Sequence, residues 1–150
     1  MHEIFKLENV FYDLEVSSKE DCLEKLAQYA FESGISNDAQ QTYQDYLNRE
    51  KEVSTGFTDG FAIPHAKSSS IEKPAILVAK LKNSVDWKSM DGEPTQIIIV
   101  LNIPKESKGG LHIQLLSNLS RKIMKADFRE AVQNSQSAAE LFKAVNHVFN

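Results

Sequence analysis

Gln96-Ile97-Ile98-Ile99-Val100-Leu101-Asn102 is the stretch that says most about the fold of this chain. β-branched and aliphatic residues follow one another without polar alternation, which is typical of a strand buried on both faces of a sheet. The run is also too short to be a helix of ordinary length. It therefore predicts a central strand in a sheet that is covered on both sides.

A second run, Ala75-Ile76-Leu77-Val78-Ala79-Lys80-Leu81, has the same character and predicts a second central strand. Residues 87–94 lie between the two runs and contain Asp-Gly and Pro, which favour a turn-rich connection. Residues 4–14 mix apolar and polar positions and predict a further strand, and Phe61-Ala62-Ile63 predicts a short one.

Two helices are predicted before the central strands. Ser18 is a candidate N-cap for a helix that ends at Gly34, and Asp38 is a candidate N-cap for a helix that ends near Glu52. The second helix would carry Arg49 at its C-terminal end. The apolar face predicted for the first helix consists of Cys22, Leu23, Leu26, Ala27, Ala30 and Phe31.

More helices are predicted after the central strands. A polar loop over residues 105–110 leads into an apolar stripe at helical spacing, which consists of Leu111, Leu115, Leu116, Leu119 and Ile123. Shorter helices are expected at residues 128–132 and after the candidate cap Ser137, through Leu141, Phe142, Val145 and Val148. With no repeat or linker, this order predicts an α/β sandwich in which residues 1–150 form a single domain.

The composition excludes several classes of protein. The formal net charge is -4 and no segment is rich in Lys or Arg, which argues against binding to nucleic acid. No apolar run approaches the length of a membrane-spanning helix, and Met1-His2-Glu3-Ile4 lacks the features of a signal peptide. The single cysteine, Cys22, lies among apolar residues and is expected to be an inert core thiol. We expect a cytoplasmic protein without direct membrane insertion.

Pro64-His65 is the pair most suited to chemistry. It follows a glycine-punctuated loop and the short apolar run that ends at Ile63. Proline fixes its own φ and restricts the residue before it to extended conformations, so the histidine leaves the strand in a defined direction. A histidine held in this way can accept and release a group near neutral pH. The alternative is a strand-end histidine with a structural hydrogen bond.

The surroundings of this pair favour the chemical interpretation. Ser54-Thr55-Gly56, Gly60 and Ala62-Ile63-Pro64-His65, with Leu47-Asn48-Arg49-Glu50 before them and Gly109-Gly110-Leu111-His112-Ile113-Gln114-Leu115-Leu116 after them, form one extended pattern. This pattern resembles the fructose/mannitol-type (type 2) enzyme IIA domain of the bacterial phosphoenolpyruvate-dependent sugar phosphotransferase system. The resemblance covers nearly the whole chain and implies a mixed central β-sheet flanked by α-helices.

The resemblance also implies a function and its partners. His65 would accept a phosphoryl group on Nε2 from the histidine phosphocarrier protein and pass it to a IIB domain of a sugar permease. No cofactor is implied, and the transported sugar would not contact this domain. An alternative role is that of the nitrogen-type enzyme IIA proteins, whose phosphorylation state controls protein partners. An intact set of Arg49, His65 and His112 is compatible with both roles.

Arg49 is the candidate partner of the phosphoryl oxygens, because a guanidinium offers a planar fork of donors that stays charged. From its position alone it is equally an exposed residue at a helix end that pairs with neighbouring carboxylates. The resemblance favours the site role, because family members carry an Arg-Glu pair at this distance before Ser-Thr-Gly. Ser54 and Thr55 are candidate hydroxyl donors to the same oxygens, or simple turn formers.

His112 is expected in the first turn of its helix, at the border of the apolar stripe. The free N–H groups and the positive dipole end of that turn attract anions, and an imidazole there can donate a hydrogen bond to a phosphoryl group. The alternative is a half-buried histidine that packs beside Leu115 and Leu116. The resemblance places His112 at the second active-site histidine of the family.

Other chemistries find no support in the sequence. A zinc site needs three or four ligands, and neither Cys22 nor His147 joins His65 and His112 in a recognisable pattern. The sequence also lacks the Gly-x-Ser-x-Gly elbow of many hydrolases and a Walker-type phosphate loop. We therefore expect no metal and no bound nucleotide.

Two features of the loop before His65 lead to further expectations. Phe57 and Phe61 are candidate contacts for protein partners on a shallow apolar surface around His65. Thr58 stands where the family usually has glycine, which predicts a stiffer or differently shaped turn.

Overall fold

The apolar run of residues 96–102 lies in the middle of the sheet, as its sequence predicted. In the computed structural model, which describes residues 4–107 and 109–149, it forms part of strand β5 (Thr95–Pro104). The second apolar run forms part of β4 (Ala75–Val85), which pairs antiparallel with β5. Both predicted central strands are confirmed, and each extends beyond the predicted range.

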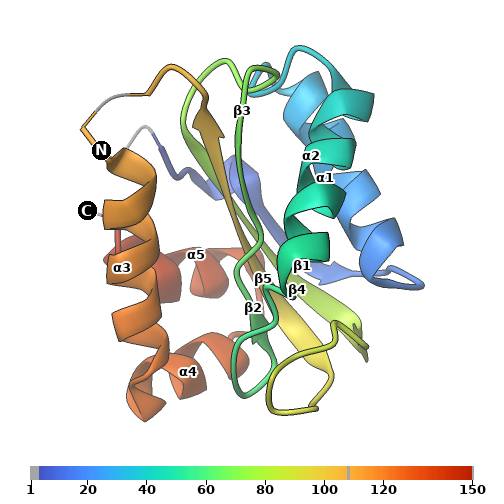
Figure 1. The fold of residues 1–150 in the computed structure, drawn as a ribbon. Coiled ribbons are helices and arrows are strands. Elements are labelled where there is room, and N and C mark those ends of the chain that lie inside the picture. Colours follow the sequence, from blue (N-terminus) through green and yellow to red (C-terminus); the bar gives the residue numbers. More distant parts are fainter. Residues whose placement is uncertain (1–3, 108, 150) are drawn as a thin grey trace.

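Parallel strands complete the sheet on both sides of this pair. β1 (Val10–Leu14) pairs with β4, whereas β2 (Phe61–Ala62) and β3 (His65–Ser68) follow one another along β5. The sheet is therefore mixed, and the predicted α/β class with a central mixed sheet flanked by α-helices is confirmed (Figure 1).

The alternation of side chains along β5 divides the core into two parts. Ile97, Ile99 and Leu101 face one side of the sheet, and Ile98 and Val100 face the other. Figure 1 shows α1 (Lys19–Glu32) and α2 (Ala39–Glu52) on one face and α3 (Leu111–Ile123), α4 (Ala126–Gln133) and α5 (Ala138–Asn146) on the other. A strand with apolar residues at every position is needed because both faces are covered.

The three predicted helix caps are confirmed. The hydroxyl oxygen of Ser18 accepts from the N–H of Asp21, the Asp38 carboxylate accepts from Gln41, and the Ser137 hydroxyl accepts from Glu140. Each side chain satisfies an N–H group that has no partner within its helix. The predicted end of the first helix is also confirmed, since Gly34 follows it with a φ of 85°.

Three expectations about the helices and strands were wrong. The segment 4–14 is not one strand, because a 3-10 turn at Leu7–Asn9 precedes β1. The last helix ends at Asn146, so Val148 lies beyond it. Phe31 does not join the buried face of α1, and its side chain is 46% exposed. It follows Ala30, which faces the sheet, and a rotation of about 100° per residue turns it towards solvent.

Two findings concern the expectations from composition. Cys22 lies on the buried face of α1 and is fully enclosed, as predicted for a core thiol, and burial raises the pKa of its thiol to about 12. Within the described part of the chain, no helix has the length and apolar character needed to cross a membrane.

The break between β2 and β3 is the feature of the fold that creates the site. The N–H of Ile63 turns away from β5 and donates to the carbonyl of Thr55 at 3.0 Å, while the carbonyl of Pro64 accepts from Leu101 at 3.0 Å. Proline has no N–H to offer the ladder, so the strand is interrupted there and resumes at His65. The third residue of the predicted strand, Ile63, therefore lies outside β2.

Candidate functional site

The half-buried His65 is held by a hydrogen bond at each ring nitrogen. Its Nδ1 lies 3.0 Å from the carbonyl oxygen of Ile63, and its Nε2 lies 2.9 Å from Nε of Arg49. A carbonyl only accepts and a guanidinium only donates, so Nδ1 carries the proton and Nε2 carries the lone pair. The geometry therefore makes Nε2 the nucleophilic atom of this histidine.

The electrostatic surroundings also favour the neutral imidazole. Burial lowers the pKa of His65, the hydrogen bond to Ile63 opposes this effect, and the positive charge of Arg49 lowers the pKa further. Glu50 acts in the raising direction and His112 in the lowering direction. The result is a pKa below the usual value for histidine, so Nε2 keeps its lone pair at neutral pH.

An NMR titration of the imidazole checks this arrangement. We expect the pKa of His65 to lie below 6.5, the usual value for histidine, and the Nδ1–H tautomer to be present above that midpoint. Because the folded-state pKa is lowered, this histidine contributes stability that is present above the unfolded-state pKa and is lost as the pH falls through the folded-state pKa. The urea-unfolded protein gives the reference midpoint. A His65 midpoint equal to that reference, or an Nε2–H tautomer, would contradict the arrangement.

Arg49 is in contact with His65 and is not a residue that pairs only with neighbouring carboxylates, while its predicted role as partner of the phosphoryl oxygens stays a prediction. It lies in the last turn of α2, and its Nη1 donates to the carbonyl of Val53 at 2.8 Å while its Nε contacts His65. Within residues 4–107 and 109–149, its Nη2 makes no hydrogen bond. This part of the guanidinium fork is therefore available to an oxygen atom brought close to Nε2 of His65.

His112 is the second residue of α3 and is half-buried, so the predicted position in the first turn is confirmed. Gly109 and Gly110 before it have φ values of 77° and 66°, a conformation that residues with a side chain rarely adopt. They turn the chain sharply into the helix. The charge of His112 is among the causes that lower the pKa of His65, so the two rings lie within electrostatic reach.

Ser54 and Thr55 lie beside the site, but their hydroxyl groups already have partners. Ser54 donates to the carbonyl of Trp87, and Thr55 donates to the carboxylate of Glu50 and accepts from the indole N–H of Trp87. Thr55 is also buried. Contact of either hydroxyl with a bound anion would require the exchange of one of these bonds, so the role predicted for them stays a proposal.

Gly56 is required by the packing of the same loop. A Cβ atom at this position would lie 2.2 Å from Oγ of Ser89 and 2.8 Å from its Cα. The backbone of the loop can approach residue 89 only because position 56 has no side chain. The Ser-Thr-Gly sequence therefore combines two anchored hydroxyls with one close backbone approach.

Glu50, Lys19 and Trp87 are site neighbours that sequence reasoning did not assign. The Nζ of Lys19 lies 2.7 Å from the carboxylate of Glu50, with side chains that are 12% and 5% exposed. Trp87 is fully buried between them and the loop. The adjacency of Glu50 to Arg49 was the only signal available, because Lys19 and Trp87 are remote in the sequence.

The two phenylalanines proposed as partner contacts differ. Phe57 is half-buried and packs against the apolar core on the α3 side of the sheet. Phe61 is fully buried, with its ring near that of Phe128, so its assignment as a partner contact was wrong. Phe61 belongs to β2 and points into the core under α3 and α4, where no partner can reach it.

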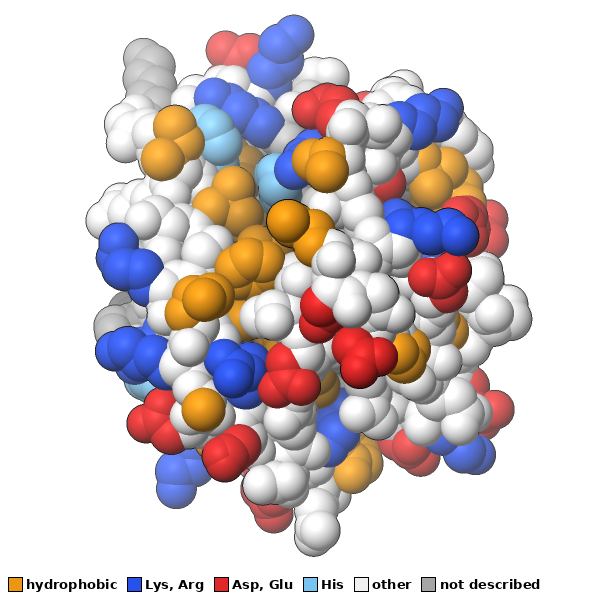
Figure 2. All heavy atoms as spheres, turned by 60° about the horizontal axis from the view of Figure 1, so that its bottom comes forward, with side chains coloured by type: hydrophobic (Ala, Val, Ile, Leu, Met, Phe, Trp, Pro, Cys, Tyr) orange, Lys and Arg blue, Asp and Glu red, His pale blue; other side chains and the backbone are white. Residues whose placement is uncertain are grey.

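Two other apolar side chains are exposed at the surface, where Phe61 was expected to be. Ile113 is 63% exposed on α3, and Val53 is 58% exposed after α2. Figure 2 shows two histidine side chains at one end of a band of apolar side chains on a single face, with basic side chains next to them. The shallow apolar surface that the sequence predicted around His65 stays a prediction.

Thr58 does not occupy the strained position of its turn. The left-handed conformations fall on Asp59, with a φ of 53°, and on Gly60, with a φ of 83°. Asp59 is held there by Asp91, which accepts its N–H, and by an ion pair with Arg129 at 3.0 Å. Thr58 only supplies a carbonyl that accepts from Phe61. A side chain at position 58 therefore costs no strain in φ.

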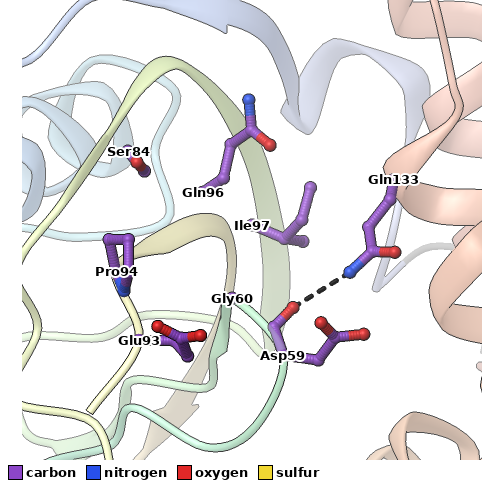
Figure 3. Close-up of a pocket in the computed structure, with 8 residues that line it drawn as sticks. All are labelled: Asp59, Gly60, Ser84, Glu93, Pro94, Gln96, Ile97 and Gln133. Carbon is purple, nitrogen blue, oxygen red and sulfur yellow. Dashed lines mark hydrogen bonds between the residues drawn. The ribbon is translucent and has the colours of Figure 1, made fainter.

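The pocket drawn in Figure 3, of about 360 Å³, lies away from the histidines. It is lined by Asp59, Gly60 and residues at the beginning of β5, and Gln133 closes one side by donating to the carbonyl of Asp59. Phe61 pairs with Ile97, whereas His65 pairs with Leu101. The pocket thus lies about 13 Å from His65 along the strands. It contains no nucleophile of the kind that His65 provides.

Comparison with known proteins gives one family. The family described as "Phosphoenolpyruvate-dependent sugar phosphotransferase system, EIIA 2" matches residues 3–148. The fructose-like EIIA component of Escherichia coli is 35% identical over 115 residues, 77% of this chain and 77% of that protein. The fructose-specific EIIABC component of Bacillus subtilis is 30% identical over 144 residues. This match spans 96% of the present chain but only 22% of that protein.

Nitrogen regulatory proteins are similar to this chain at a comparable sequence identity. A nitrogen regulatory protein of Pseudomonas aeruginosa is 33% identical over 133 residues, 89% of this chain and 86% of that protein. The crystal structure of IIA-Ntr from Neisseria meningitidis has a TM-score of 0.87, 28% identity, and coverage of 96% of this chain and 97% of that one. The fold is also shared, at 18% identity and a TM-score of 0.78, with IIAMtl in its complex with phosphorylated IIBMtl from Escherichia coli, over 95% of this chain and 99% of that chain.

Proposed function

Because this chain belongs to the type 2 enzyme IIA family of the phosphoenolpyruvate-dependent sugar phosphotransferase system, we propose that it carries a phosphoryl group on Nε2 of His65. The observation that supports this most directly is the pair of hydrogen bonds that leaves the lone pair on Nε2. A phosphoryl acceptor needs an unprotonated nitrogen, and Nε2 can use its lone pair once Arg49 turns its Nε–H to a phosphoryl oxygen.

The proposed step is an in-line displacement at phosphorus. The lone pair of Nε2 forms the new P–N bond, and the P–N bond of the donor phosphohistidine breaks with its electron pair returning to the donor nitrogen. Arg49 then exchanges its contact with Nε2 for one with a phosphoryl oxygen. Since both nucleophiles are protein side chains, catalysis consists of positioning and of stabilising charge.

Arg49 and His112 are the proposed stabilisers of the phosphoryl oxygens. Arg49 offers Nη2 as well as the Nε that now contacts His65. His112 lies at the N-terminal end of α3, where free N–H groups favour an anion. Together they would supply positive charge and hydrogen-bond donors to the phosphoryl oxygens, without a nucleotide or a metal in the proposed mechanism. Ser54 and Thr55 remain proposed as additional donors, and each hydroxyl would first have to give up the hydrogen bond that it now donates.

The proposed partners are the histidine phosphocarrier protein as donor and a IIB domain of a sugar permease as acceptor, in the cytoplasm. Family membership supports this pair, and a protein of the same fold is known in complex with a phosphorylated IIB protein. Phe57, Ile113 and Val53 are proposed as contacts, because they are exposed or half-buried apolar side chains on or near the site's loops and helices. A small apolar interface suits brief encounters with two partners in turn.

A regulatory role is the second candidate. It is favoured by the nitrogen regulatory relatives, one of which is 33% identical and another of which has a TM-score of 0.87. The chemistry at His65 would be the same in both roles. Only the acceptor would differ, because a regulator changes its protein contacts with its phosphorylation state.

A phosphotransfer assay tests the proposed function. The protein is incubated with phosphorylated histidine carrier protein, and the labelled product is then offered to a panel of IIB domains. We expect labelling of this chain and onward transfer to at least one IIB domain. Labelling without onward transfer to any IIB domain would favour the regulatory role, and absence of labelling by the histidine carrier would contradict the proposed donor.

A further inference from the structure

A buried ion pair lies directly behind the reactive residues. Lys19 at the start of α1 contacts Glu50 at the end of α2 at 2.7 Å, and both side chains are almost fully buried. Removing two charges from water costs several kcal/mol per ion unless good geometry offsets it. A pair of this kind is therefore better explained by the arrangement that it enforces than by the stability that it adds.

Glu50 uses both carboxylate oxygens to hold the loop that precedes β2. One oxygen accepts from the N–H of Thr55 at 3.0 Å, and the other accepts from the Thr55 hydroxyl. The indole N–H of Trp87 donates to the same hydroxyl at 3.1 Å, and Lys19 also donates to the Trp87 carbonyl at 3.3 Å. Thr55 is thus fixed from several directions.

Thr55 in turn is connected to both partners of the reactive contact. Its carbonyl accepts from the N–H of Ile63, whose own carbonyl accepts from Nδ1 of His65. On the other side, the carbonyl of Val53, which lies between Glu50 and Thr55 in the chain, accepts from Nη1 of Arg49. Holding Thr55 therefore fixes the anchor of the imidazole and the anchor of the guanidinium at once.

We propose that Lys19 and Glu50 are positioning residues for phosphoryl transfer, which hold Arg49 and His65 in register through Thr55. This inference rests on the proposed function. Neither residue touches the phosphoryl group in this scheme. They act because a displacement of about 1 Å between reacting groups can slow a reaction on the order of a hundredfold.

The test compares Glu50→Gln with Glu15→Gln, which makes the same chemical change in an exposed pair with Lys82 at 3.7 Å. The amide oxygen of Gln can keep the bond from the N–H of Thr55, but an NH2 group, which only donates, then replaces the oxygen that accepts from the Thr55 hydroxyl. We expect Glu50→Gln to lower the rate of labelling by about tenfold or more, with little change in KM for the phosphorylated carrier. Glu15→Gln should behave as wild type.

A second readout separates positioning from a general loss of structure. In folded Glu50→Gln we expect the NMR signals of the His65 ring nitrogens to shift, because their hydrogen bonds to Ile63 and Arg49 are no longer held in register. If Glu50→Gln does not fold because Lys19 is left unpaired, Lys19→Met/Glu50→Gln replaces it, since that variant buries no charge. The double variant should fold and still transfer slowly.

The outcomes distinguish this inference from the proposed function. Wild-type labelling rates in folded Glu50→Gln, or in the double variant, would overturn the positioning role while leaving the phosphocarrier role intact. Failure of the wild-type protein to accept phosphate would overturn the phosphocarrier role, and the positioning inference would fall with it. Unchanged NMR signals of the His65 ring nitrogens in folded Glu50→Gln would also count against the inference.

Discussion

Replacing His65 with alanine is expected to remove all phosphate that the histidine carrier protein transfers to this chain. The variant lacks the Nε2 lone pair, and no other described side chain is hydrogen-bonded so as to present one beside Arg49. In the wild type, the label should be lost in acid and kept in alkali, as expected of a phosphoramidate. Acid and alkali treatment of the labelled protein, followed by intact-mass measurement, checks both points.

Two histidine variants serve as controls for this experiment. His112→Ala should still accept phosphate at His65, because it removes a proposed donor and leaves the nucleophile in place. His147→Ala should behave as wild type, since its ring packs edge-on against that of Phe128 and not against His65 or Arg49. Label that persists in His65→Ala, or that disappears only in His112→Ala, would show that the nucleophile has been assigned to the wrong residue.

Arg49→Lys is expected to slow phosphoryl transfer by about thirty- to more than a hundredfold, which corresponds to a loss of about 2 to 3 kcal/mol in the transition state. Lysine keeps the positive charge, so this variant tests geometry. In the structure, Arg49 spans from Nε2 of His65 to the carbonyl of Val53 and has Nη2 left over. A single ammonium group cannot hold both contacts and a phosphoryl oxygen in one plane.

Arg121→Lys provides the matched control for the arginine variant. Arg121 is an exposed residue of α3 that donates to Ser117 and Asn118 on its own helix, so its replacement should leave the transfer rate unchanged. Single-turnover labelling kinetics of the two variants, with circular dichroism to verify folding, give the comparison. A folded Arg49→Lys protein that transfers at the wild-type rate would reduce Arg49 to an anchor for Val53.

Local sequence patterns predicted the elements of the fold well because they have local causes. Ser18, Asp38 and Ser137 cap helices through bonds within one turn of chain. The apolar run around Ile99 had to be a buried strand because both of its faces are covered. Phe31 shows the limit of this reasoning, since the width of a buried helix face depends on what packs against it and not on the helix itself.

Burial of the site residues could not be predicted in the same way. Phe57 and Phe61 look alike in the sequence, yet one is half-buried beside the site and the other is fully enclosed under α4. The sequence offered the hydroxyl groups of Ser54 and Thr55 as donors to a phosphoryl group, yet in the structure they already donate to Trp87 and to Glu50. The ladder position of β2 and the packing of Trp87 decide these outcomes, and both arise from pairings between distant parts of the chain.

The sequence by itself determined the class of fold, the helix caps, the proline that interrupts the strand, and the identity of His65, Arg49 and His112 as the residues to consider. Each of these follows from neighbouring residues or from one continuous pattern. Only the tertiary structure decided that Arg49 donates to Nε2 of His65, and that Lys19 and Glu50 hold the loop behind them. The physical reason is that a hydrogen bond or an ion pair forms only when the distance between its two side chains is correct to within a few tenths of an ångström. The packing of helices on a sheet sets these distances, and sequence spacing does not.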